Sequence, residues 1–162
     1  MAELTGAMGI GAPSLYAAFG DKKALFREVV DVYQRTHGAF ALRALAEEPT
    51  ARQGVARLLR EAAAEYTDAR HPRGCLVISA ATNCGPDSAD IEDMLRRQRN
   101  ANVREIERRI RADVKAGELP PDTDPKALAT FTAAVLQGMS QQARDGATRA
   151  QLEAVAQATM RA

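Results

Sequence analysis

The sequence contains few aromatic residues, few cysteines and no long apolar segment. Tryptophan is absent, phenylalanine and tyrosine together make up 4% of the 162 residues, and there are two cysteines. Two cysteines cannot build a disulfide framework and suggest a reducing compartment, and no apolar run reaches the ~18–20 residues that a membrane helix needs. These absences exclude a disulfide-rich secreted domain and a membrane-spanning protein, and they predict a cytoplasmic location.

Strong net charge and recognisable catalytic motifs are also missing. The formal net charge is +1, so the composition alone does not indicate a nucleic-acid partner. The chain has no glycine-rich phosphate loop and no nucleophile elbow, and its two histidines, His37 and His71, lie in no ligand-spaced cluster with the cysteines. The sequence therefore favours a protein that is not an enzyme and predicts neither a metal site nor a cofactor.

Residues 4–30 carry the most informative pattern of the chain, which begins with two short helices joined by a tight turn. Gly9 and Gly11 flank Ile10 and interrupt the first helix. Glycine tolerates the positive φ values that such a turn requires. Pro13 suits the first turn of the next helix, where its missing N–H leaves no hydrogen bond unmade.

The second short helix ends after Phe19, and a capped third helix follows. Leu15 and Phe19 are four positions apart and share one helix face. Gly20 ends this helix, and Asp21 is a good N-cap for the helix that begins at Lys22. This is the layout of a helix-turn-helix, whose second helix enters the DNA major groove.

The order of residues in this segment resembles the recognition segment of the TetR family of bacterial transcription regulators. In that family the pattern spans the end of helix 2, helix 3 and the start of helix 4. Every fixed position of the pattern is filled in this sequence, by Gly9, Ile10, Leu15, Tyr16, Phe19, Lys22 and Leu25. The resemblance implies a DNA-binding domain over residues 1–36, expected to be incomplete at its N-terminus because the family's first helix precedes this point, and a helical ligand-binding and dimerisation domain over residues 37–162.

The resemblance also implies which side chains contact DNA. The start of the recognition helix is expected to read bases, through apolar contacts from Ala12 and Pro13 and a hydrogen bond from Ser14. Tyr16 is similar to a family tyrosine that contacts a phosphate, and Lys22 to a family lysine whose charge faces a phosphate at a helix start. Thr5, on the first visible helix, is the remaining candidate for a backbone contact.

Most of the remaining chain is predicted to form amphipathic helices, since few stretches show the alternation of strands. The apolar spacing and the intervening turn signals place helices over residues 22–43, 51–69, 75–83, 88–116, 125–143 and 148–160. The fold class is therefore all-α, with an N-terminal helix-turn-helix domain followed by a larger helical effector-binding and dimerisation domain.

The helix over residues 88–116 also carries many charges of alternating sign. Pairs such as Glu105–Arg109 and Glu107–Arg111 have the spacing of ion pairs on a helix surface. We interpret these charges, Asp113 included, as a solvated helix face. Lys23 is likewise interpreted as a solvated charge.

In the resembling family the second domain binds a small effector and dimerises through its last two long helices. Small and apolar residues on the last two predicted helices form the expected homodimer interface, which comprises Ala129, Ala133, Leu136, Met139, Leu152 and Val155. The effector pocket is expected among the preceding helices and the first of these two. Its candidate wall residues are Tyr66, Ile78, Asn83, Met94, Phe131 and Gln137.

These inferences predict a DNA-binding transcription regulator, a homodimeric repressor that a small-molecule effector releases from a palindromic operator in double-stranded DNA. Two alternatives stay open. The chain could be a helical effector-binding or dimerisation module that does not bind DNA. It could also be a regulator that senses redox state through Cys75 or Cys84.

Overall fold

The computed structural model describes residues 1–161, apart from the side chains at positions 82, 83 and 86. Within that part of the chain every regular element is helical, which confirms the predicted all-α class. None of the described helices is both long and apolar enough to span a membrane. The α-helices are α1 (Ala2–Met8), α2 (Ala12–Phe19), α3 (Lys22–Arg35), α4 (Ala39–Glu47), α5 (Ala51–Tyr66), α6 (Leu76–Ser79), α7 (Ala89–Ala116), α8 (Pro125–Arg144) and α9 (Arg149–Thr159), and two 3₁₀ turns, η1 (Ala80–Asn83) and η2 (Pro86–Ser88), precede α7.

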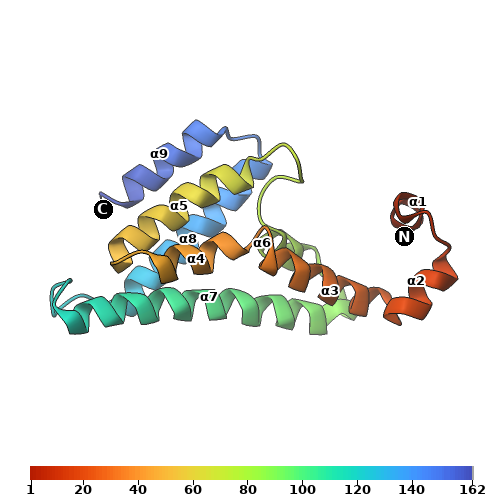
Figure 1. Cartoon of the computed structure of the whole chain (residues 1–162), viewed down its shortest axis with the longest axis horizontal. Coiled ribbons are helices and arrows are strands. Elements are labelled where there is room, and N and C mark those ends of the chain that lie inside the picture. The colour runs from red at the N-terminus through yellow and green to blue at the C-terminus, as the bar shows by residue number, and fades with distance from the viewer. Residues whose placement is uncertain (162) are drawn as a thin grey trace.

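The helices form an elongated molecule in which α7 lies along one side (Figure 1). Helices α4, α5, α8 and α9 form a bundle over one half of α7, and α3 extends from this bundle toward α1 and α2 at the other end of the molecule (Figure 1). The two short N-terminal helices are thus held away from the bundle, and α3 is the element that connects them to it.

Two apolar clusters hold this arrangement together. The larger one lies within the bundle and is built from α4, α5, α7, α8 and α9, with Leu58, Leu59 and Leu152 at most 1% exposed. The smaller one joins α3, α6 and α7 through Val30, Val77 and Leu95. Because apolar burial contributes about 25 cal/mol per Å², this second cluster stabilises the position of α3 against α6 and α7.

Several predicted helix ends are confirmed. The Asp21 side chain accepts a hydrogen bond of 2.7 Å from the Ala24 backbone N–H, and Thr50 caps α5 by accepting from Gln53. Gly117 ends α7 with a φ of 81°, a left-handed conformation that glycine adopts without steric cost.

The predicted single helix over residues 22–43 is wrong, because the chain breaks between α3 and α4. The Thr36 hydroxyl donates to the Val32 carbonyl at 2.8 Å, and the Gly38 backbone N–H donates to the Tyr33 carbonyl at 2.7 Å. At Gly38 the chain turns so tightly that a β-carbon would lie 3.2 Å from the Gln34 α-carbon. A side chain here would require the Gln34 backbone to shift by a few tenths of an ångström, so the turn that redirects the chain into α4 favours glycine.

The expectation that Asp113 lies on a solvated face is also wrong. Asp113 is 4% exposed, and its carboxylate accepts a 2.6 Å hydrogen bond from the Ala51 backbone N–H. Ala51 is the first residue of α5, where N–H groups have no partner within the helix. Arg109 pairs with Asp113 at 3.4 Å, whereas the predicted pairing of Glu107 with Arg111 is confirmed.

Candidate DNA-binding and effector sites

Helices α1 and α2 form the predicted helix-turn-helix. Gly9 ends α1 with a φ of 65°, and Gly11 is the N-cap of α2 with extended backbone. The turn is closed by the Ile10 backbone N–H, which donates to the Thr5 carbonyl at 3.1 Å. The glycines thus give the chain the backbone freedom that the sequence indicated, and α2 leaves the turn at the far end of the molecule (Figure 1).

The first turn of α2 presents the residues predicted to read bases. Ala12, Pro13 and Ser14 are exposed, while Leu15, the next residue, is 1% exposed. Tyr16 follows with 41% of its surface exposed. The start of α2 is therefore a free surface anchored by one buried leucine.

The two predicted DNA-contact residues that flank α2, Thr5 and Lys22, differ in whether their side chains are hydrogen-bonded within their own helix. The Thr5 hydroxyl donates to the carbonyls of Met1 at 3.2 Å and Ala2 at 3.1 Å, within its own helix. Lys22 is exposed at the first position of α3, where the partial positive charge of the helix start adds to its own. Lys22 is thus the better placed of the two to bind a phosphate.

Lys23 is partly exposed to solvent, as the sequence suggested, but it also forms an ion pair. Its ammonium lies 2.6 Å from one carboxylate oxygen of Asp90, and the Arg27 guanidinium lies 2.5 Å from the other. The paired cations hold the pKa of the Asp90 carboxyl below its usual value, with the Lys23 hydrogen bond as the largest cause. This three-residue contact joins the first turns of α3 to the start of α7.

A pocket opens in the bundle between α4, α5, α7 and α8. Its wall is mostly apolar, with Phe40, Leu58 and Leu136 among its side chains, and Arg99 and Gln137 add polar groups. The Arg99 guanidinium donates to the Val77 carbonyl at 3.2 Å. An apolar cavity with a few polar groups is the usual form of a small-molecule site.

The structure brings three of the predicted pocket residues together and separates the others. Tyr66, Ile78 and Gln137 line the pocket. Met94 packs against the smaller apolar cluster instead, and Phe131 is 45% exposed on α8 and lines a different depression. The side chain of Asn83 lies outside the described part of the chain.

Sequence reasoning missed the contribution of α4 to this pocket. The pocket is lined by Phe40, Ala41, Leu42 and Leu45. The sequence instead predicts that residues 22–43 form one continuous helix. The sequence feature that could have indicated the break between α3 and α4 is the Thr36–Gly38 segment, where a threonine and a glycine interrupt the apolar spacing. Arg99 and Asn102 were missed because they belong to the charged stretch of α7 that resembled a solvated face.

Two tyrosines flank Cys75 at the edge of the pocket. Burial raises the pKa of Tyr66 well above its usual value, and the nearby Cys75 raises it further. Burial also raises the pKa of Tyr33, again with Cys75 as the next cause. Both phenols therefore stay protonated and can donate hydrogen bonds. Cys75 and Cys84 are free and partly exposed, so redox sensing by either thiol stays a prediction.

The predicted dimer residues fall into three groups. Ala129, Met139 and Leu152 are at most 1% exposed and belong to the chain's own core. Val155 is 40% exposed on α9. Ala133 and Leu136 are partly buried and line the pocket. Exposed apolar side chains on α8 and α9, rather than the buried ones, are available to a partner.

Comparison with known sequences matches most of the chain to one family. Residues 51–159 match the family described as the tetracyclin repressor-like, C-terminal domain. The chain is 34% identical to the HTH-type transcriptional repressor ComR of Escherichia coli K12, over 99% of this chain and 77% of the relative. It is 29% identical to the HTH-type transcriptional repressor BdcR of the same organism, over 96% of this chain and 74% of the relative.

Solved structures agree with the sequence comparison. A cysteine variant of the TetR family transcriptional regulator CifR, complexed with 26-base-pair double-stranded operator DNA, superposes with a TM-score of 0.95 and is 46% identical. The match covers 100% of this chain and 85% of that one. A TetR regulator from Rhodococcus sp. RHA1 superposes with a TM-score of 0.71 at 33% identity, over 99% of this chain and 85% of that one.

Proposed function

The chain belongs to the TetR family of transcriptional regulators, and from this premise we propose that it is a DNA-binding repressor with α2 as its recognition helix. The observation that carries the proposal is the exposed first turn of α2. Ala12, Pro13 and Ser14 are free to contact base edges, while Leu15 anchors the helix from behind. The similar regulator CifR has been solved on operator DNA, which supports the same role for this helix-turn-helix.

Binding to the phosphate backbone would come from the residues around α2. Tyr16 and Lys22 are both exposed and lie on either side of the α2–α3 turn. A phenol hydroxyl and an ammonium are both donors that phosphate oxygens accept. These contacts fix the position of α2 on the duplex, and the base contacts supply the sequence preference.

We propose that the repressor is a homodimer formed through α8 and α9. Exposed apolar side chains on these helices support this interface. Leu128 and Phe131 on α8 are 42% and 45% exposed, and Val155 on α9 is 40% exposed. A two-fold dimer carries two copies of α2 and therefore calls for a palindromic operator. Such a regulator acts where its DNA is, which for this bacterial family is the cytoplasm.

Release from DNA would follow from effector binding in the bundle pocket. Cys75 and Val77 line that pocket and also belong to the small apolar cluster that holds α3. A ligand that fits the pocket better when α6 is displaced would therefore also move α3 and the α2 helix attached to it. Only the difference in its affinity for the two arrangements shifts the equilibrium between them.

The proposed function is tested by binding to double-stranded DNA from the region upstream of the protein's own gene. Fluorescence anisotropy across a salt series is expected to show log K falling linearly with log salt concentration. Footprinting is expected to show two protected half-sites, one helical turn or a multiple of it apart. Equal affinity for every duplex, or no binding at low salt, would support the alternative of a module that does not regulate transcription through DNA.

A further inference from the structure

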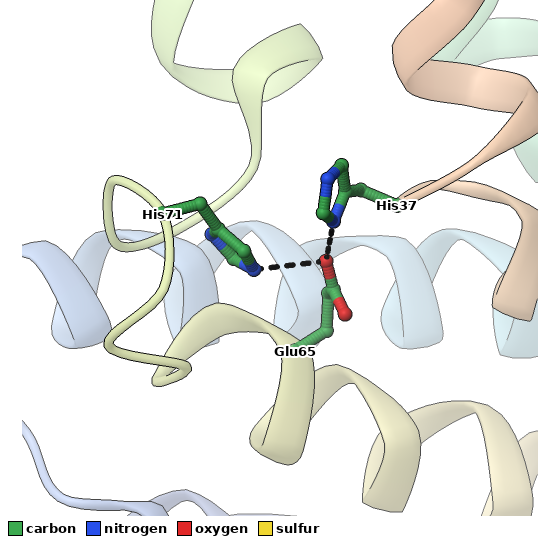
Figure 2. Close-up of side chains that lie close together, drawn as sticks. All are labelled: His37, Glu65 and His71. Carbon is green, nitrogen blue, oxygen red and sulfur yellow. Dashed lines mark hydrogen bonds and ion pairs between the residues drawn. The ribbon is translucent and has the colours of Figure 1, made fainter.

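Three side chains that are distant in the sequence meet beside the junction of α3 and the bundle. His37 follows α3, Glu65 lies at the end of α5, and His71 belongs to the loop after α5 (Figure 2). The His37 Nδ1 lies 2.8 Å from Glu65 Oε1, and the His71 Nε2 lies 3.1 Å from the same oxygen. The imidazole rings are in edge contact, with their centroids 4.7 Å apart.

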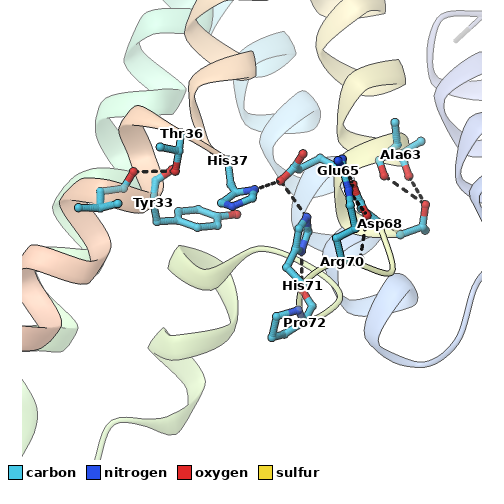
Figure 3. Close-up of polar contacts among 12 residues, drawn as sticks. Tyr33, Thr36, His37, Ala63, Glu65, Asp68, Arg70, His71 and Pro72 are labelled. Carbon is cyan, nitrogen blue, oxygen red and sulfur yellow. Dashed lines mark hydrogen bonds and ion pairs between the residues drawn. The ribbon is translucent and has the colours of Figure 1, made fainter. Parts of the chain in front are cut away.

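One ring nitrogen of His71 contacts a backbone carbonyl, and the other is buried and faces the Glu65 carboxylate. Its Nδ1 lies 3.1 Å from the Pro72 carbonyl oxygen (Figure 3), and because a carbonyl only accepts, Nδ1 must carry the hydrogen. Nε2 is then the ring nitrogen that faces Glu65. This nitrogen is buried and has no aligned hydrogen-bond partner among the described residues, although it lies close to a carboxylate oxygen that also only accepts.

A cation between these atoms could bind both histidine nitrogens and the carboxylate oxygen at once. Metal-bound histidines usually donate their other ring N–H to a backbone carbonyl or a carboxylate, and His71 already makes such a bond to Pro72. Two histidines and a glutamate are an established donor set for Zn²⁺, with bonds of about 2.0–2.2 Å. Tetrahedral geometry at that radius puts donor atoms about 3.3 Å apart. The donor atoms of this cluster all lie within 4.8 Å of one another. An ion requires the two nitrogen–oxygen pairs to open by about half an ångström or less, and the two imidazole nitrogens to approach each other by up to about 1.5 Å.

We propose that His37, Glu65 and His71 form a binding site for a divalent transition-metal ion of the Zn²⁺ class. The site is open on one side, since the His37 side chain is 50% exposed while those of Glu65 and His71 are 22% and 17% exposed. This leaves an entry path and a coordination position for water. Tyr33 stacks on His37 with ring centroids 6.0 Å apart and limits where the ring can turn (Figure 3).

The location gives the ion a structural consequence. His37 lies at the break between α3 and α4, and the other two ligands belong to the bundle and its loop. A bound ion therefore ties the end of α3 to α5. If the proposed function holds, this clamp biases the position of α3 and of the recognition helix it carries, so that Zn²⁺ changes the affinity for DNA.

The test is titration of tag-free protein with Zn²⁺ alone, in competition with a chromophoric chelator and without DNA. We expect one ion per chain. Because loss of an outer-shell partner already lowers metal affinity about 10- to 100-fold, H37A, E65Q and H71A are each expected to lower it at least tenfold. The matched control is E61Q, because Glu61 lies one turn earlier on α5 and pairs with Arg57 instead. Its zinc affinity is expected to equal that of the unmodified protein.

Cobalt substitution identifies the donor atoms. With Co²⁺ the protein is expected to show visible d–d absorption without a thiolate charge-transfer band, and H37A is expected to abolish it. His37 is half exposed, so this variant keeps the test valid even if H71A does not fold. Equal zinc affinity in E65Q and E61Q, a thiolate band that assigns the ion to Cys75, or no binding at micromolar zinc would each overturn the proposed site.

The proposed effect of zinc on operator affinity is measured separately from zinc binding. Zinc is expected to change operator affinity in the unmodified protein and in E61Q, and to leave it unchanged in H37A. Absence of DNA binding under all conditions would count against the proposed function, but it would not affect the conclusion drawn from the zinc titration. Tight zinc binding with no change in operator affinity would overturn the clamp.

Discussion

Replacement of Asp113 by alanine is expected to lower the free energy of unfolding by about 3–5 kcal/mol, the usual cost of removing one partner of a buried ion pair. Asp113 is 4% exposed and is bonded to the Ala51 N–H and paired with Arg109. The substitution leaves a guanidinium that is only partly exposed without its carboxylate, and it removes the acceptor from the first N–H of α5. Since α5 contributes more side chains to the larger core than any other element, the whole bundle should lose stability.

Urea denaturation followed by circular dichroism measures this effect. The control is D93A on the same helix, because Asp93 is more exposed and pairs with Arg96 and Arg97 at the surface. Exposed pairs contribute about 0–1 kcal/mol. If D113A does not fold, D113N can be measured instead. It keeps the side-chain shape and an acceptor oxygen for the Ala51 N–H, and its free energy of unfolding is expected to fall by an intermediate amount. A loss below about 1 kcal/mol in D113A would contradict the structural role of this carboxylate.

Replacement of Lys22 by alanine is expected to weaken operator binding and unrelated duplex binding by a similar factor. A lysine that contacts a phosphate contributes affinity without sequence preference, and its loss should reduce the slope of log K against log salt by about 1 per site. The proposed dimer carries two such lysines, so its slope should fall by about 2. Anisotropy measurements across a salt series give both quantities.

The control for this variant is K126A. Lys126 is also exposed in the first turn of a helix, but it lies on α8 and not beside the helix-turn-helix. Its loss removes the same charge and is expected to leave the salt slope unchanged. A salt slope that falls equally in K22A and K126A would show that the effect comes from net charge and not from a phosphate contact at α3.

The sequence predicted those features that depend on neighbours along the chain. The glycines of the α1–α2 turn, the Asp21 and Thr50 caps and the Gly117 helix end act within a few residues of themselves, so their residue types carry the information. The recognition motif could also be identified from the sequence, because its positions lie within one short segment. Element types and most helix ends followed from these local rules.

What the sequence did not show depends on contacts between distant segments. Asp113 has the spacing of a surface charge on α7, and only the placement of the α5 N-terminus against it makes it a buried cap. His37 and His71 appeared unrelated because the break at Thr36–Gly38 and the loop after α5 bring them together. The predicted pocket lacked its α4 wall for the same reason. The sequence places Phe40 and Leu42 on one helix over residues 22–43, whereas the structure divides this segment into α3 and α4.

The most direct test of the central claim is photo-crosslinking from the recognition helix. Tyr16, which is 41% exposed, is replaced by p-azidophenylalanine, and the protein is irradiated on its operator. The same substitution at Tyr33, which contacts His37 far from α2, is the control. Crosslinks to both half-sites are expected from position 16 and none from position 33. Operator binding that persists with no crosslink from position 16 would contradict the assignment of α2 as the helix that contacts DNA.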